Sequence, residues 1–323
     1  MMTLAEAGPL LGARHSGGDA VFSGVSTDSR SLKRGELFVA LRGERFDGHE
    51  FLDAARAAGA AGAVVDGAYE GQPPLPLLIV ADTRRALGDL ARHWRARFAP
   101  VLVAITGSNG KTTTKEMLAS ILRRHAGEDQ VLATAGNLNN DVGLPLTLLR
   151  LRSAHRYCAI ELGMNHKGEI AHLAGIARPT VALVNNAQRE HLEFMHTVDE
   201  VAEENASLYA ALSADGTAVV NSDDPHADVF RRAAGAHRSL EFGLEGSAAV
   251  GARYELRPLS SDIRVRTPSG EAPATLAIPG LHNVRNALAA CAVGLCLGMR
   301  FGLIAEGLRM FDGVQRRLQV RGE

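Results

Sequence analysis

Residues 101–114 read VLVAITGSNGKTTT, and this stretch decides the fold. Its first part, Val101 to Ile105, is an almost unbroken apolar run, which is typical of a parallel strand buried on both faces. A glycine loop follows, and the residues after it predict a helix that extends to about Arg124. A buried strand, a glycine loop and a helix in this order predict an α/β fold with an anion-binding loop beside the sheet.

The loop contains the residue types that phosphate binding needs. Gly107 and Gly110 let the backbone turn and direct N–H groups toward an anion, while the helix N-terminus adds partial positive charge. Lys111 is one of four lysines among 35 basic residues, and its ammonium is placed to reach the β- and γ-phosphates of a nucleotide. The hydroxyl of Thr112 is placed to ligate Mg²⁺. An ordinary glycine turn with a threonine cap is the alternative.

The length of 323 residues is enough for two domains, each with its own core. Residues 1–97 predict a small α/β domain, and Asp82 or Thr83 is expected to cap its last helix. Its short strands are expected at 37–41, 62–65 and 77–80.

Residues 98–313 predict a central domain with a mostly parallel, doubly wound sheet and a small antiparallel sheet between 237 and 278. Further parallel strands are expected at 158–162, 181–185 and 217–221, and helices at 198–212, 284–297 and 303–311. Ser222 or Asp223 is expected to cap a helix that begins near Pro225. Residues 314–323 are interpreted as a linker.

The composition excludes several classes of protein. Basic and acidic residues number 35 and 36, so there is no basic field to attract nucleic acid. Three cysteines in apolar runs do not form a disulfide framework and indicate a reducing compartment. The N-terminus lacks a secretory signal, and the longest apolar stretch, 287–299, is shorter than the ~20 residues of a membrane span. We therefore expect a cytoplasmic protein with no membrane partner.

Several motifs resemble the Mur ligase family. The short TGxxGKT form of the loop is found in Mur ligases and in folylpolyglutamate synthetases, which resemble each other. Further matching stretches lie at 26–30, 37–49, 134–149, 160–170 and 280–290 and so span nearly the whole chain. They are most similar to the branch that joins D-alanyl-D-alanine to UDP-N-acetylmuramoyl-tripeptide. The resemblance implies that a substrate carboxylate attacks the γ-phosphate of ATP, and that an amine then displaces phosphate from the acyl phosphate.

The resemblance also implies catalytic roles for Lys111, Glu161 and His191. Thr112 and Glu161 would hold the first Mg²⁺, since carboxylate and hydroxyl oxygens suit this hard cation, and His191 would lie near a second metal. A strand-end carboxylate in solvent and a histidine that only makes structural hydrogen bonds are the alternatives. The expected ATP-binding residues are Gly107, Ser108, Asn109, Gly110, Lys111, Thr112, Thr113, Asn283, Asn286 and Arg317.

The two asparagines after Gly280 would pair with the adenine edge, because an amide offers both a donor and an acceptor. Asn283 could also be a helix N-cap. The uridine or diphosphate of the substrate is expected at Thr27, Asp28, Ser29 and Arg30, and the muramoyl-peptide at Asn139 and Asn140. Ordinary capped turns would explain both sets without a ligand.

Three features depart from the family pattern. Asn205 occupies the place of a lysine that is carbamoylated in several members, so water, Glu203 or Glu204 would have to substitute for it near the second metal. Residues 315–318 read QRRL where Pro-Gly-Arg-Leu is usual, so the Pro-Gly pair is missing while Arg317 matches. The chain also ends before the third domain, which in the family binds the incoming amine.

The leading hypothesis is an ATP-dependent ligase of peptidoglycan precursor synthesis, monomeric, with UDP-N-acetylmuramoyl-tripeptide and D-alanyl-D-alanine as substrates. Two alternatives remain open. If 323 residues are the whole molecule, it would bind nucleotide and UDP-sugar with little or no ligation. It could also be another Mur ligase or a folylpolyglutamate synthetase.

Overall fold

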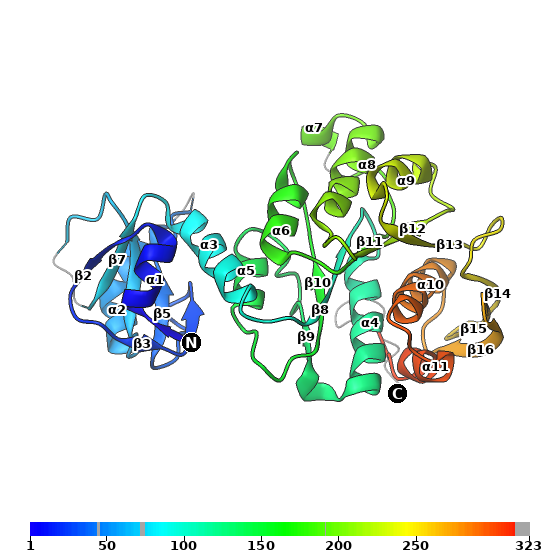
Figure 1. Cartoon of the computed structure of the whole chain (residues 1–323), viewed down its shortest axis with the longest axis horizontal. Coiled ribbons are helices and arrows are strands. Elements are labelled where there is room, and N and C mark those ends of the chain that lie inside the picture. The colour runs from blue at the N-terminus through cyan, green and yellow to red at the C-terminus, as the bar shows by residue number, and fades with distance from the viewer. Residues whose placement is uncertain (44–45, 72–74, 191, 314–323) are drawn as a thin grey trace. The chain divides into compact units, whose positions relative to one another are not determined.

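The computed structural model describes residues 1–43, 46–71, 75–190 and 192–313 (Figure 1). Its contacts divide the chain into two units: unit 1 contains residues 1–98 and 141–151, and unit 2 contains 99–140 and the residues from 152 onward. Residues 141–151 were expected in the central domain. They instead pack with unit 1, because the helix they form lies against α3 and the carbonyl of Leu151 accepts a hydrogen bond from the Trp94 indole at 3.1 Å.

Unit 1 is a small α/β domain built on a five-stranded sheet of order β2-β7-β6-β5-β4, with β2 antiparallel and the others parallel. The strands are β2 (Arg14–Ser16), β4 (Gly24–Ser26), β5 (Glu36–Val39), β6 (Gly62–Asp66) and β7 (Leu77–Val80). It also contains a two-stranded ribbon, β1 (Met2–Thr3) and β3 (Val21–Phe22). Its helices in the described ranges are α1 (Leu4–Leu11), η1 (Gly48–Phe51), α2 (Leu52–Ala57), α3 (Thr83–Arg95) and α5 (Gly143–Leu148). Asp82 caps α3 as expected, since its carboxylate accepts from two backbone N–H groups.

Unit 2 is built on a six-stranded parallel sheet of order β13-β12-β11-β8-β10-β9. The strands are β8 (Val101–Thr106), β9 (Val131–Ala133), β10 (Tyr157–Glu161), β11 (Val181–Val184), β12 (Thr217–Asn221) and β13 (Arg238–Phe242). From β8 the chain passes to one edge, and from β11 it passes toward the other. The crevice between the carboxyl ends of β8 and β11 is therefore a topological switch point, where open α/β sheets bind their ligands.

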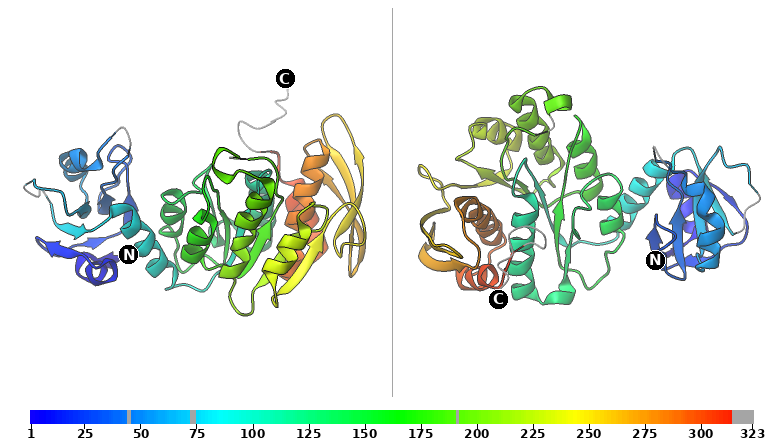
Figure 2. Two further views of the ribbon diagram at one scale, coloured as in Figure 1. Left: turned by 90° about the horizontal axis from the view of Figure 1, so that it is seen from above. Right: turned by 180° about the vertical axis from the view of Figure 1, so that it is seen from behind.

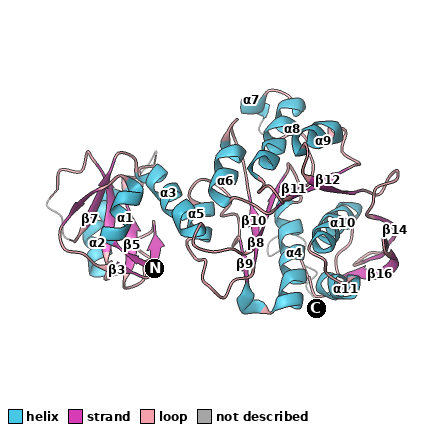
Figure 3. Cartoon of the chain, in the orientation of Figure 1, coloured by secondary structure: helices cyan, strands magenta, loops and turns pink. Residues whose placement is uncertain are grey.

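Helices cover both faces of this sheet, as Figure 3 shows by the magenta strands between cyan helices. The helices of unit 2 are α4 (Lys111–Ala126), η2 (Glu128–Gln130), α6 (Glu169–Ala177), α7 (Leu192–Met195), α8 (Val198–Ala206), η3 (Ser207–Ala211), α9 (Ala227–Ala234), α10 (Leu281–Cys296) and α11 (Phe301–Arg309). Alternate residues of β8 face opposite sides: Val103 and Ile105 join the core beneath α4 and α10, whereas α6 packs on the other face. Burial on both faces explains the continuous apolar run of β8.

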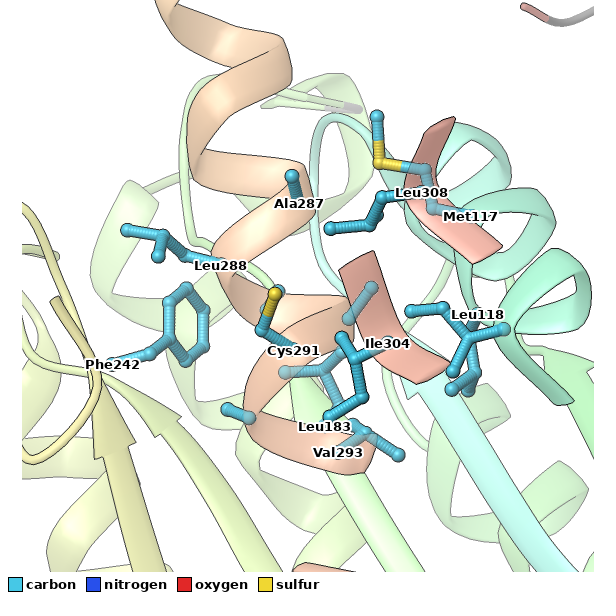
Figure 4. Close-up of a cluster of buried hydrophobic side chains, with 14 of the residues drawn as sticks. Met117, Leu118, Leu183, Phe242, Ala287, Leu288, Cys291, Val293, Ile304 and Leu308 are labelled. Atoms are coloured by element: carbon cyan, nitrogen blue, oxygen red, sulfur yellow. The ribbon is translucent and has the colours of Figure 1, made fainter. Parts of the chain in front are cut away.

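A three-stranded antiparallel sheet, β14 (Gly251–Leu256), β15 (Ser261–Thr267) and β16 (Gly270–Leu276), packs beside α10 and α11 (Figure 2). Its inward residues Ile263 and Leu276 belong to the same core as β8 and α4. Figure 4 shows the centre of that core, where Cys291 and Leu288 of α10 lie among side chains from α4, α11, β11 and β13. Burial nearly all round explains why the sequence of α10 has so few charges.

The predicted fold class is confirmed: an α/β chain with a mostly parallel central sheet and a small antiparallel sheet. Two local predictions are wrong. The helix expected over 198–212 changes at Ser207 to the 3-10 helix η3, and neither Ser222 nor Asp223 caps α9, which begins at Ala227. The carboxylate of Asp223 instead accepts from the backbone N–H groups of Leu244 and Glu245. Within the described ranges, no helix combines the length and apolarity needed to cross a bilayer.

Candidate active site in unit 2

The glycine loop joins β8 to α4 and has no room for side chains at its two glycines. Gly107 has φ +130°, and an added Cβ would lie 2.9 Å from the backbone nitrogen of Asn186. Gly110 is the N-cap of α4 with φ +77°, and an added Cβ would lie 2.2 Å from Oδ1 of Asn286. Both positions thus need glycine for conformation and for space. They bring the loop close to the residues after β11 and at the start of α10.

Lys111 lies at the first turn of α4, with its ammonium folded back over the loop. Its Nζ donates to the carbonyl oxygens of Gly107 and Ser108, the second at 3.2 Å, and lies 3.4 Å from Oε2 of Glu190. The other oxygen of Glu190 is buried and has no hydrogen-bond partner among the described residues. The lysine therefore lies over the loop, held by two backbone carbonyl oxygens and by the carboxylate of Glu190.

Glu161 ends β10 beside the loop and is only 1% exposed. Its Oε1 accepts from the Thr112 hydroxyl at 3.1 Å and from Nδ2 of Asn139 at 2.8 Å. Its Oε2 is buried and has no partner in the described part of the chain. A buried carboxylate oxygen without a partner is costly unless a proton or cation completes it. The strand-end carboxylate is therefore not solvated, and the alternative of an exposed Glu161 is wrong.

The donor set fits Mg²⁺. Glu161 and Thr112 offer a carboxylate and a hydroxyl oxygen side by side, while no group of three or more His, Cys, Asp or Glu that could hold a metal ion is found among the described residues. Magnesium is usually held by one or two carboxylates together with substrate phosphates and waters, rather than by a full protein cage. The site has this composition, with the phosphate loop adjoining it.

A cavity of about 600 Å³ opens at the switch point between β8 and β11. This volume is within the range of pockets that hold small ligands and cofactors. Its walls come from the ends of three parallel strands and the start of α10. The lining residues are Asn109, Gly110, Thr113, Asn185, Asn186, Gln188, Asn221, Asp223, Asp224, Pro225, Ile278, His282, Asn283, Arg285, Asn286, Phe311 and Gly313.

The two asparagines of α10 face this cavity with opposite hydrogen-bonding groups available. Nδ2 of Asn283 donates to the carbonyl of Pro279 at 2.7 Å, which leaves its Oδ1 as an acceptor. Oδ1 of Asn286 accepts from Asn185 at 3.1 Å, which leaves its Nδ2 as a donor. Adenine presents an amino donor next to a ring-nitrogen acceptor, so one acceptor and one donor match its edge. The N-cap of α10 is Gly280, so the alternative in which Asn283 caps this helix is wrong.

The asparagine cluster that follows β11 was not predicted from the sequence. Asn186 Oδ1 accepts from the backbone N–H of Asn109 at 2.8 Å, and Asn185 Nδ2 donates to the Asn109 carbonyl at 2.7 Å. The side chain of Gln188 accepts from Asn109 Nδ2 at 2.7 Å. Residues at the carboxyl ends of neighbouring parallel strands converge, and this rule applied to 185–188 and 221–224 would have found them.

Asn205 does not face the loop's ligand side. It is fully buried, its Oδ1 accepts from the Thr106 hydroxyl at 2.7 Å, and its Nδ2 donates to the Val201 carbonyl at 2.9 Å. It thus ties α8 to the last residue of β8. Glu204 is also committed, because its two oxygens accept from the N–H groups of Gly168 and Ile170 at the start of α6, each at 2.8 Å. The idea that Glu204 replaces the family lysine as a metal ligand is therefore wrong.

The residues expected to bind uridine lie in unit 1, just after β4. Asp28 accepts from the backbone N–H of Arg30 at 3.0 Å and from its guanidinium at 2.9 and 2.8 Å. These hydrogen bonds hold the pKa of Asp28 down at about 2. The Arg30 side chain is 88% exposed. The turn is therefore preformed, with a charged pair at the surface.

Asn139 and Asn140 belong to unit 2, where Asn139 is half-buried beside Glu161 and Asn140 is exposed. Two of the expected site residues, His191 and Arg317, lie outside the described residues, as does the interpreted linker 314–323. Their roles stay predictions.

Comparison with known proteins agrees with this geometry. Residues 105–294 match the model of the Mur ligase middle domain, and residues 21–95 match the Mur ligase family catalytic domain. The chain belongs to the Mur ligase family. The family assignment made from the motifs is thereby confirmed, and the middle-domain match includes the cavity-lining residues from Asn109 to Asn286.

Individual relatives narrow the resemblance within the Mur ligases. The chain is 39% identical over 319 residues to the UDP-N-acetylmuramoyl-tripeptide–D-alanyl-D-alanine ligase of Escherichia coli, covering 98% of this chain and 70% of that protein. A crystal structure of MurF from Acinetobacter baumannii superposes with a TM-score of 0.92 at 36% identity, covering 100% of this chain and 71% of that one. The crystal structure of MurF from Thermotoga maritima in complex with ADP superposes with a TM-score of 0.80 at 28% identity. It covers 93% of this chain and 68% of that one.

The chain spans about two thirds of the length of these relatives: 70% of the Escherichia coli ligase and 64% of the Haemophilus influenzae ligase. Both of these curated relatives carry the name of the D-alanyl-D-alanine ligase. A folylpolyglutamate synthetase from L. casei shares the fold at 14% identity and a TM-score of 0.58, over 70% of this chain. At that identity the likeness concerns the fold alone.

Proposed function

We propose that this chain acts in the ATP-dependent ligation of D-alanyl-D-alanine to UDP-N-acetylmuramoyl-tripeptide, the reaction after which its curated relatives are named. The observation that carries the proposal is the cavity at the switch point, which joins a phosphate loop to a matched pair of amides. We also place the reaction in the cytoplasm, where ATP is abundant and the chain's three free cysteines stay reduced.

The nucleotide would enter with its base against α10 and its phosphates on the loop. Asn286 donates to the base and Asn283 accepts from it, so adenine is bound at one ring nitrogen and at its amino group. The α4 N-terminus and the loop amides take the phosphates, because both direct N–H groups toward an anion. Binding requires Lys111 to leave the carbonyls of Gly107 and Ser108 and to turn to the phosphate oxygens, which accept a stronger, charge-assisted hydrogen bond.

Thr112 and the free oxygen of Glu161 would hold Mg²⁺ beside these phosphates. When bound, the ion neutralises phosphate charge and so lowers its repulsion toward an attacking carboxylate. Asn139 orients Glu161 through its amide Nδ2, which leaves its own Oδ1 for the muramoyl-peptide. His191 remains a proposed neighbour of a second metal.

The chemical difficulty of the reaction is the approach of two anions. The carboxylate of the tripeptide must reach the γ-phosphate, and Lys111 supplies the positive charge that makes this approach favourable. The carboxylate oxygen forms a bond to phosphorus as the bond to ADP breaks. The amine of D-alanyl-D-alanine then forms the amide bond and loses a proton to solvent, and phosphate leaves with the electron pair of the carbon–oxygen bond. The turn at Thr27–Arg30 in unit 1 is proposed to hold the uridine diphosphate.

Nucleotide binding tests the first half of this proposal. A fluorescent ATP analogue titrated against the protein with Mg²⁺ should bind, and Lys111→Met should weaken binding at least tenfold, because charge-assisted hydrogen bonds of about 1.5–3 kcal/mol are lost. Lys167→Met is the matched control, since that lysine is 55% exposed and pairs with Glu200. Equal affinity of the two variants would contradict the loop assignment.

Phosphate release tests the second half. With ATP and UDP-N-acetylmuramoyl-tripeptide, release that increases on addition of D-alanyl-D-alanine supports ligation by this chain. Binding of both ligands without dipeptide-dependent release would reduce the proposal to nucleotide and UDP-sugar binding. Replacing the tripeptide substrate by a folate substrate distinguishes the remaining alternative within the superfamily.

A further inference from the structure

Lys115 is a buried lysine that the proposed reaction does not use. Its side chain is 0% exposed, although a lysine is among the residues least often buried. The ammonium donates to the carbonyl oxygen of Thr134 at 2.6 Å and pairs with the carboxylate of Glu116. Burial of an ammonium is unfavourable unless it is well paired. The contacts of its two partners therefore indicate what this charge does.

The first partner, Thr134, is the residue that follows β9, and it connects to the metal carboxylate. Its backbone N–H donates to the Ala159 carbonyl at 3.0 Å, and its hydroxyl oxygen accepts from the backbone N–H of Glu161 at 2.9 Å. Thr134 is itself only 1% exposed. Lys115 therefore holds the carbonyl group of Thr134 in place. The hydroxyl group of Thr134 in turn holds the backbone N–H of Glu161.

The same helix also holds the other end of Glu161. Thr112 and Lys115 are three residues apart on α4 and so lie on neighbouring positions of one helix face. Thr112 donates to the carboxylate of Glu161, whereas Lys115 acts through Thr134 on its backbone. Glu161 is thus connected to the helix that begins at the phosphate loop both through its carboxylate and through its backbone.

We propose that Lys115 is a positioning residue that holds Glu161 in place for Mg²⁺ through Thr134. The proposal rests on the proposed function, since it concerns the cation that accompanies the nucleotide. Because the orphaned Oε2 of Glu161 must reach an ion that also contacts the phosphates, a small displacement of its backbone weakens binding of the ion more than binding of the nucleotide. Partners that orient a metal ligand commonly change metal affinity 10- to 100-fold when they are removed.

The test measures the Mg²⁺ concentration that gives half of the Mg²⁺-dependent increase in binding of a fluorescent ATP analogue. Lys115→Met, which preserves length without charge, should raise this midpoint about tenfold. Its affinity for the analogue in EDTA should stay within about twofold of wild type, since Lys115 does not line the nucleotide cavity. Glu116→Gln is the matched control: it removes the ion pair, retains the bond from Lys115 to Thr134 and should leave the midpoint unchanged.

A folded Lys115→Met protein with the wild-type Mg²⁺ midpoint would overturn the inference, because a merely structural lysine would change only the unfolding midpoint. If that variant fails to fold, Thr134→Val and Thr134→Ser decide. Valine removes the hydroxyl that accepts from Glu161 and should raise the Mg²⁺ midpoint, while serine retains the hydroxyl and should not; equal midpoints overturn the inference. Failure of the wild-type chain to bind the analogue with Mg²⁺ present refutes the proposed function instead.

Discussion

Alanine at Gly110 offers a sharp test of the nucleotide cavity, because unit 2 contains a matched glycine. Gly110 and Gly168 are both helix N-caps in the left-handed region, with φ/ψ of 77°/0° and 89°/−10°. An added Cβ at Gly110 would lie 2.2 Å from Oδ1 of Asn286 and 2.7 Å from Nδ2 of Asn185. At Gly168 the same Cβ meets nothing within 4 Å. The two substitutions share their backbone strain and differ in the clash.

The expected magnitudes follow from this difference. An alanine in the left-handed backbone conformation destabilises the folded state by about 1 kcal/mol or slightly more, and this applies to both variants. Gly110→Ala also displaces Asn286 and breaks its 3.1 Å hydrogen bond with Asn185, which adds about 1 kcal/mol. We therefore expect unfolding free energies lower by about 1 kcal/mol for Gly168→Ala and about 2 kcal/mol for Gly110→Ala. Since Asn286 also contacts the base in the proposed complex, Gly110→Ala should weaken nucleotide binding about tenfold.

Urea unfolding gives the two stabilities, and titration with a fluorescent ATP analogue gives the two affinities. Gly168→Ala should retain wild-type affinity. If Gly110→Ala binds the analogue as tightly as Gly168→Ala does, then Asn286 does not contact the nucleotide, and the assignment of the base to α10 is wrong.

Three further predictions concern buried groups. Asn205→Ala should lower the free energy of unfolding by about 2 kcal/mol, because it leaves the Thr106 hydroxyl buried without its acceptor; an unchanged urea midpoint would argue against this tie between α8 and β8. Glu204→Gln should lower the free energy of unfolding by about 1 kcal/mol, since a neutral amide is a poorer acceptor for the N–H groups of the α6 N-terminus than a carboxylate. Measuring the urea midpoint of this variant as a function of salt concentration checks the electrostatic part. Burial raises the pKa of Cys291 to about 12 from 9.0, so unfolding releases its proton and stability should fall as pH rises between these values. Cys291→Ala should show a shallower fall, and an equal slope would show that other groups cause it.

The phosphate loop could be read from the sequence because every signal for it is local. The buried strand, the two glycines, Lys111 and the helix are consecutive, and backbone geometry follows from neighbouring residues. The same holds for the Asp82 cap and for α10, which was expected as a helix over 284–297. Glu161 was found only through the resemblance, since nothing in its neighbours says that a carboxylate at the end of β10 is buried beside Thr112.

Errors arose where a local signal competed with a partner distant in sequence. Asp223 has the residue type of a helix cap, yet its carboxylate is occupied by the N–H groups after β13. Glu204 seemed available near a metal, yet it caps α6, some 36 residues earlier in the chain. Residues 141–151 follow the substrate loop in sequence but pack with unit 1.

By itself, then, the sequence determined the fold class, the parallel sheet and the anion-binding turn, because hydrophobic period and glycine placement act over a few residues. Only the tertiary structure decided which side chains converge. It places Asn185 beside Gly110 and joins Asn205 to Thr106 by a hydrogen bond. It also connects Lys115 to Glu161 through Thr134. These side-chain contacts depend on strand order and register, which bring the carboxyl ends of separate strands to one edge of the sheet. No short-range pattern encodes them.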